Sequence, residues 1–168
     1  MTLPFDINDP ATYPPVGSPM WHLHHEGLME WLTEPLVDRV NYVEKYKAET
    51  EIETRLRWMT PVLGTLPASV VKARAAYDEA RAVYTKALAA HDTARAAYDT
   101  LWATSAEAWA AYNTLWATSA KAWAAYNMAW AAYNKAWNAA KPAIKALHTI
   151  EHLGCPWDGR TIFPEGTP

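Results

Sequence analysis

A tryptophan recurs every seven residues along one long stretch of this chain, and the spacing strongly constrains the fold. Residues 97–112 recur almost unchanged at 111–126, so the repeat is fourteen residues, or two heptads. A strict heptad keeps one face of a helix turned toward a neighbouring helix when the helices supercoil. The repeat therefore predicts a long helix that packs lengthwise against another helix.

The surrounding composition supports a helix. Between Pro67 and Pro142 there is neither glycine nor proline, and alanine, the strongest helix former, is the commonest residue. A helix this long is expected to form either a coiled coil or a helical hairpin. Both share the same heptads, so the periodicity leaves the two alternatives open.

Tyrosines occupy a second heptad position, four residues before the tryptophans, where they alternate with serine. Such alternation of large and small residues leaves space for aromatic rings from a facing helix. Charged residues are dense in 72–95 and sparse in 98–140, which indicates a covered second part. We call the expected contact face the aromatic seam and assign to it Tyr98, Trp102, Trp109, Tyr112, Trp116, Trp123, Tyr126, Trp130, Tyr133 and Trp137.

Prolines, glycines and helical periodicity divide the rest of the chain. The fold prediction is all-α: a long heptad-repeat helix with short N-terminal helices and a small turn-rich C-terminal cap. The predicted regions are an extended proline-rich arm at 1–20, short helices and a connector at 21–67, the heptad-repeat region at 68–141, and a helix with a hairpin-like CPWDG cap at 142–168.

A metal site is the one chemical constellation that the residues indicate. His148 and His152 are four residues apart on one predicted helical face, and Cys155 follows the helix end. Two imidazoles and a thiolate suit Zn²⁺, but a structural site needs a fourth ligand. His22, His24 or His25 could supply it only if their segment, interpreted as a polar helix start, packs beside the tail. The alternative is that the histidines are ordinary surface residues and the cysteine a small buried hydrophobe.

Several function classes are disfavoured. The formal charge of −3 without a Lys/Arg block argues against nucleic-acid binding. The start of the chain lacks a signal-peptide pattern and no run of 18 apolar residues occurs, so we expect neither standard secretion nor a membrane span. No nucleophile with its base, phosphate loop or carboxylate pair can be identified, so we do not expect an enzyme.

Two segments carry a resemblance. EIETRLRWMTPVLGTLP, residues 51–67, and CPWDGRTIFP, residues 155–164, are similar to segments of uncharacterised proteins encoded by tailed bacteriophages and their hosts. Those proteins carry a variable alanine-rich helical region between the two segments and often end in H-x3-C-x2-C-P-W, which implies a small metal knuckle. His148 and Cys155 match that pattern, and His152 stands where its first cysteine would be.

The function expected from these observations is a phage-related structural or assembly protein that forms a homo-oligomer, or binds other virion or host proteins, through the aromatic seam. The resemblance implies a bacterial cytoplasm or a phage virion as its setting. The alternative is a monomeric adaptor that binds a host or viral protein and carries a zinc knuckle in its tail.

Overall fold

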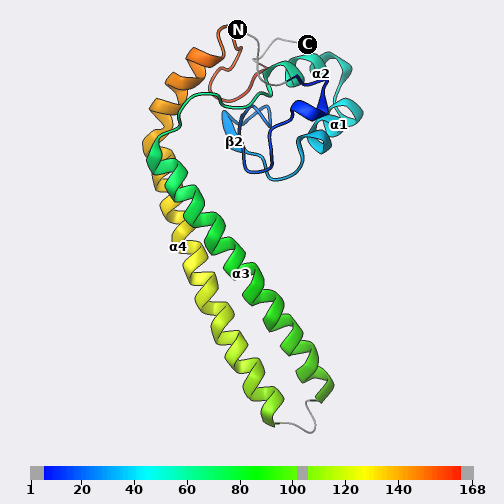
Figure 1. The fold of residues 1–168 in the computed structure, drawn as a ribbon, viewed down its shortest axis with the longest axis vertical. Helices are drawn as coiled ribbons and strands as arrows, with labels where there is room; N and C mark the ends of the chain where they lie inside the picture. The colour runs from blue at the N-terminus through cyan, green and yellow to red at the C-terminus, as the bar shows by residue number, and fades with distance from the viewer. Residues whose placement is uncertain (1–5, 102–105, 164–168) are drawn as a thin grey trace. The chain divides into compact units, whose positions relative to one another are not determined.

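The computed structural model describes residues 6–101 and 106–163. The chain is mostly helical, as predicted, with helices α1 (Leu36–Tyr46), α2 (Glu49–Trp58), α3 (Ala68–Leu101) and α4 (Ala106–Glu151) (Figure 1). The all-α prediction misses a small antiparallel sheet, in which β1 (Pro19–Trp21) pairs with β2 (Met29–Trp31). None of the described helices is long and apolar enough to cross a membrane.

Two compact units form from these elements. One combines residues 1–65 with residues 142–168, and the other consists of residues 66–141. We call the first the small module and the second the helical hairpin. Helix α4 contributes residues to both, because it continues through Pro142 to Glu151. The break predicted at Pro142 is therefore wrong; a proline inside a helix removes one backbone hydrogen bond, and this helix accommodates that loss.

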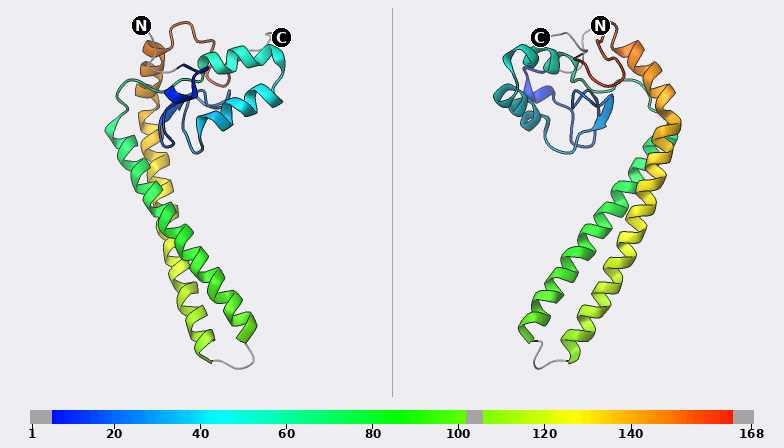
Figure 2. Two further views of the ribbon diagram at one scale, coloured as in Figure 1. Left: turned by 45° about the vertical axis from the view of Figure 1, so that its right-hand side comes forward. Right: turned by 180° about the vertical axis from the view of Figure 1, so that it is seen from behind.

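The helical hairpin consists of α3 and the first part of α4, lying side by side in opposite directions (Figures 1 and 2). Tyr77 near the start of α3 stacks with Tyr133, and Tyr98 near its end stacks with Tyr112. Of the two alternatives, the structure therefore has the hairpin, while supercoiling stays a prediction. The connection at residues 102–105, including Trp102 of the predicted seam, lies outside the described residues.

The side chains between the two helices differ from those predicted. The tyrosine position faces the partner helix, since Tyr77 and Tyr133 are only 8% and 9% exposed. So does a second heptad position, at which leucine and alanine alternate and Ala122 is 8% exposed. The tryptophan position lies one residue further along. Each residue turns a helix by about 100°, so these indoles lie at the edge of the contact. Exposed fractions are 49%, 58%, 47% and 45% for Trp109, Trp116, Trp123 and Trp130.

The small module encloses a separate aliphatic core. Its central cluster consists of Met20, Leu23, Leu32, Leu36, Val40 and Met59, contributed by the sheet, its neighbouring segments, α1 and the end of α2. Ile7 and Tyr13 pack against this cluster. Residues 1–20 are thus not simply an extended arm: the described part contains a short 3-10 helix, η1 (Pro10–Thr12), and leads into β1.

The connector after α2 also has a structural role. Trp21 N donates to Thr60 O at 2.7 Å and Val62 N donates to Pro19 O at 3.0 Å, so residues 60–62 run alongside β1. At the C-terminal end, Asp158 forms a turn by accepting from the amides of Arg160 and Thr161 at 2.7 and 2.9 Å. The described residues after α4 contain no strand, so this cap is a turn and not a strand hairpin.

The burial of the hairpin predicts unequal effects of two aromatic substitutions. We expect Tyr77→Ala to lower the free energy of unfolding by about 3 kcal/mol, because it empties a site enclosed by three aromatic rings. Trp116→Ala should lower the free energy of unfolding by only about half as much, since that indole is already half exposed. Chemical denaturation followed by far-UV circular dichroism measures both; equal costs would contradict the assignment of the tyrosine position to the interior.

Candidate metal centre

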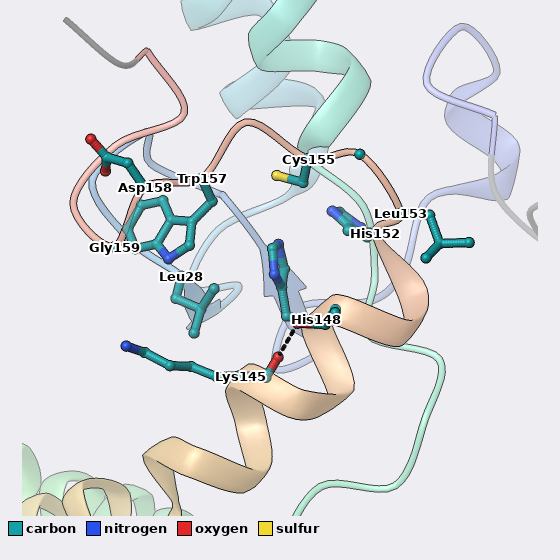
Figure 3. Close-up of a pocket in the computed structure, with 11 residues that line it drawn as sticks. Leu28, Lys145, His148, His152, Leu153, Cys155, Trp157, Asp158 and Gly159 are labelled. Atoms are coloured by element: carbon teal, nitrogen blue, oxygen red, sulfur yellow. Dashed lines mark hydrogen bonds between the residues drawn. The ribbon is translucent and has the colours of Figure 1, made fainter.

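Four potential metal ligands meet in the small module. His22, His148, His152 and Cys155 each offer one ligand atom, and these atoms all lie within 4.8 Å of one another. We call this group the His3Cys cluster. His22 follows directly after β1, whereas the other three lie at and just beyond the end of α4, where Figure 3 shows His148, His152 and Cys155 around one cavity.

The end of α4 positions three members of the cluster. His148 and His152 are one helical turn apart, so both rings lie on the same face. The chain turns at Gly154, three residues after the last residue of α4, and the Gly154 φ of 80° is left-handed and favours glycine. Cys155 N then donates to His152 O at 3.1 Å, which turns the chain back toward the helix. The spacing noted in the sequence therefore brings all three predicted ligands together.

His22 completes the cluster, and its backbone is unusual. Its φ of 45° makes it the one described non-glycine residue with a left-handed backbone. Such a conformation is costly and is commonest at functional sites. The Nδ1 atom of His22 lies 3.0 Å from Gly27 O, and its Nε2 atom lies 2.9 Å from His148 Nε2 and 3.4 Å from Cys155 Sγ. If Nδ1 carries the proton that Gly27 O accepts, the Nε2 lone pair faces the cluster.

The structure decides among the three histidines that the sequence left open. His24 Nδ1 lies 3.0 Å from a carboxylate oxygen of Glu30, and neither His24 nor His25 belongs to the cluster. The segment around them is also not the predicted helix start, because it joins β1 to β2. No sequence pattern singled out His22 from His24 and His25 as the fourth ligand. Its position depends on the pairing of two strands that are too short to recognise in the sequence.

His152 shows the clearest sign of a missing partner. Its Nε2 atom lies 2.7 Å from Thr60 Oγ1, and its Nδ1 atom is buried without a hydrogen-bond partner. A buried, unsatisfied ring nitrogen costs free energy unless something binds it. If Nε2 donates to Thr60, Nδ1 carries a lone pair. No sequence pattern indicated Thr60, which acts here as the group that orients a ligand.

Burial keeps the imidazoles neutral. Desolvation, followed by the neighbouring histidines, lowers the pKa of His22 and that of His152 to about 4, and desolvation also lowers the pKa of His148. Neutral imidazole is the form that binds metals. Desolvation raises the pKa of the Cys155 thiol, whereas a bound zinc ion would favour the thiolate.

The donor set fits zinc better than other common ions. Tetrahedral Zn²⁺ places neighbouring nitrogen and sulfur ligands about 3.3 to 3.6 Å apart, and the 3.4 Å between Cys155 Sγ and His22 Nε2 lies in that range. Carboxylates, which Mg²⁺ and Ca²⁺ prefer, are absent from the cluster. Four protein ligands fill a tetrahedral shell, which is typical of structural zinc sites. A cavity of about 370 Å³, bordered by three of the four ligands, offers a path for the ion.

A neighbouring carboxylate fixes the segments that supply the ligands. Glu151 Oε2 accepts from Trp21 Nε1 at 2.8 Å and from Leu63 N at 3.1 Å, and Oε1 accepts from Gly64 N. A Cβ at Gly64 would crowd the Leu147 methyl groups and the Glu151 carboxylate, so a larger residue there would require these side chains to shift. Glu151 therefore holds β1 and residues 63–64 against the helix that carries His148 and His152.

Comparison with protein-family models, curated proteins and solved structures finds no match to this chain. The resemblance of residues 51–67 and 155–164 to phage-encoded proteins stays a prediction.

The cluster predicts a bound metal. We expect the purified protein to contain about one zinc ion per chain and chelation to lower its melting temperature, because a structural metal contributes to folding free energy. His22→Ala and His152→Ala should each lose most of the bound zinc. Elemental analysis and thermal denaturation, with and without a chelator, measure these effects.

His24→Ala provides the matched control, since it removes an imidazole from the same segment but outside the cluster. It should leave the zinc content unchanged. Folded wild-type protein without stoichiometric metal, even after refolding with zinc, would show that the cluster is only a group of packed side chains.

Proposed function

We propose that this protein is a structural or assembly protein whose helical hairpins associate with one another through the exposed edge formed by Trp109, Trp116, Trp123 and Trp130. We call this surface the tryptophan edge. In this proposal a zinc ion at the His3Cys cluster stabilises the small module, and the helical hairpin is connected to this folded module at both of its ends.

The exposure of the tryptophan edge is the observation that carries the proposal. One part of each indole packs on an aromatic ring of α3, with centroid distances of 5.1 Å for Trp109 to Tyr98 and 5.0 Å for Trp123 to Tyr84. The rest of each ring remains accessible, with 45% to 58% exposure along the row. A row of large exposed apolar side chains is unusual on a protein surface and is typical of an interaction site.

A second copy of the chain is the partner that suits this surface. The tryptophans recur at the same seven-residue spacing in every copy, about 10.5 Å along a helix, so two edges can match over their length. Each indole is followed by alanine or a similarly small residue, which leaves room for a facing ring. Between residues 106 and 137 only Glu107, Lys121 and Lys135 are charged, so a highly charged partner would find few counter-charges. Most soluble assemblies are symmetric homo-oligomers.

The resemblance to phage-encoded proteins supports the proposed setting, a bacterial cytoplasm or a virion. The near-identical repeat of residues 97–112 at 111–126 suits a spacer whose length changes by whole heptads. Two heptads inserted at the tip of the hairpin would add one heptad to each helix and keep the heptad register.

Sedimentation velocity over a range of protein concentrations tests the proposal. We expect the wild type to form discrete oligomers or longer polymers, and the double variant Trp116→Ser with Trp123→Ser to weaken association more than tenfold, because it removes two exposed indoles from the middle of the edge. Met128→Ser is the control, since Met128 is 69% exposed on the same helix but outside the tryptophan heptad.

Far-UV circular dichroism should show that each variant keeps its helix content. A wild-type protein that stays monomeric at every concentration would contradict self-association and favour the adaptor function. Equal weakening by Met128→Ser would mean that association does not use the tryptophan edge.

A further inference from the structure

A second cavity of the small module collects positive charge. It has a volume of about 460 Å³ and lies between the segment that joins β1 to β2 and helices α1 and α2. Its permanent cations are Arg39, Lys47 and Arg55. No member of the His3Cys cluster lines it, so it is a separate site.

Arg39 is the central residue of this cavity. The residue is only 9% exposed, and its Nε donates to Leu23 O at 2.9 Å. Within the part of the chain that the structure describes, no carboxylate lies within 4.0 Å of its guanidinium, which instead lies 5.2 Å from the centroid of Tyr42. A buried arginine without a carboxylate is unusual, because the desolvated charge is normally paired. The terminal nitrogens of its guanidinium remain available for an anion.

The other two cations are likewise supported by aromatic rings. Lys47 Nζ lies 5.1 Å from the centroid of Tyr42, and the Arg55 guanidinium lies 5.0 Å from that of Phe163. A cation–π contact stabilises a cation without cancelling its charge. Arg55 also pairs with Glu51 at 2.6 Å, so Arg39 and Lys47 carry the charge that is least compensated.

The carboxylates at the cavity make their closest contacts with histidines, and Glu30 acts on Arg39 only over a longer distance. Glu30 accepts from His24 N at 2.8 Å, and a carboxylate oxygen of Glu30 also lies 3.0 Å from Nδ1 of His24. Glu26 pairs with His25 at 3.5 Å, and its side chain is 78% exposed. Neither carboxylate is within ion-pair distance of Arg39 or Lys47 among the described residues.

We propose that this cavity binds the phosphate group of a small soluble molecule, with the Arg39 guanidinium and the Lys47 ammonium as its principal ligands and Arg55 as a third positive charge. Guanidinium presents paired donors that match phosphate oxygens, and lysine contributes a mobile point charge. A dianion suits a site with three cations better than a single carboxylate does. The volume leaves room for a group attached to the phosphate.

Isothermal titration calorimetry of the full chain with inorganic phosphate, at constant ionic strength, tests this site. Lys47→Gln should weaken phosphate binding by about tenfold, the loss of one charge-assisted hydrogen bond. Lys45→Gln is the matched control. Lys45 is two residues before Lys47 in the sequence, but its Nζ atom lies over the Tyr46 ring and it does not line the cavity. Arg39→Lys should also weaken binding, and thermal denaturation shows whether that variant still folds.

Saturable binding that Lys47→Gln weakens and Lys45→Gln leaves unchanged supports the proposal. Absence of phosphate binding at millimolar concentrations overturns it, and so does an equal effect of the two lysine variants. Sedimentation with phosphatidylcholine vesicles containing phosphatidic acid distinguishes a lipid source; binding to these vesicles without binding of free phosphate also overturns the proposal. Zinc content measured in each variant shows whether the His3Cys cluster is unaffected.

Discussion

The carboxylate of Glu151 joins three segments that are far apart in the sequence. It accepts hydrogen bonds from the Trp21 indole of β1 and from the backbone of residues 63–64, while it belongs to the last turn of α4. Bonds to a charged acceptor are about twice as strong as neutral ones. His22 follows Trp21 directly, and His148 and His152 flank Glu151 on the helix. The His3Cys cluster therefore depends on this carboxylate, although Glu151 is not one of its four residues.

Local sequence patterns predicted the helical hairpin better than the small module. The heptads and the absence of glycine and proline foretold long helices, because these signals act within a few turns of one helix. The same signals did not show which residues of each helix contact the other helix. His91, for example, occupies the tyrosine position and packs between Tyr112 and Trp116, with ring centroids 5.3 and 5.4 Å away. Identical spacings of tyrosine and tryptophan do not reveal which ring lies inside.

Prediction of the site was limited in the same way. His148, His152 and Cys155 lie close in sequence, so one helical turn and the chain reversal at Gly154 bring them together. His22 and Thr60 come from distant segments, and their approach requires the β1–β2 pair and the neighbouring residues 60–62. Three-residue strands carry almost no alternation that a sequence pattern could detect. The metal prediction therefore left the fourth ligand open among His22, His24 and His25, and it did not include Thr60, which orients His152.

The size of its core explains why the small module would use a metal. Six residues form its central aliphatic cluster, and much of the remaining interior is polar or aromatic, including buried His22, His148 and His152. Disulfides and metals are common supplements to a limited hydrophobic core. The single cysteine excludes an internal disulfide. A zinc ion at the His3Cys cluster would cross-link residue 22 to the 148–155 segment, and it would satisfy the His152 nitrogen that is otherwise buried without a partner. Because this link would close a loop of more than a hundred residues, it would restrict the unfolded chain and so stabilise the folded module.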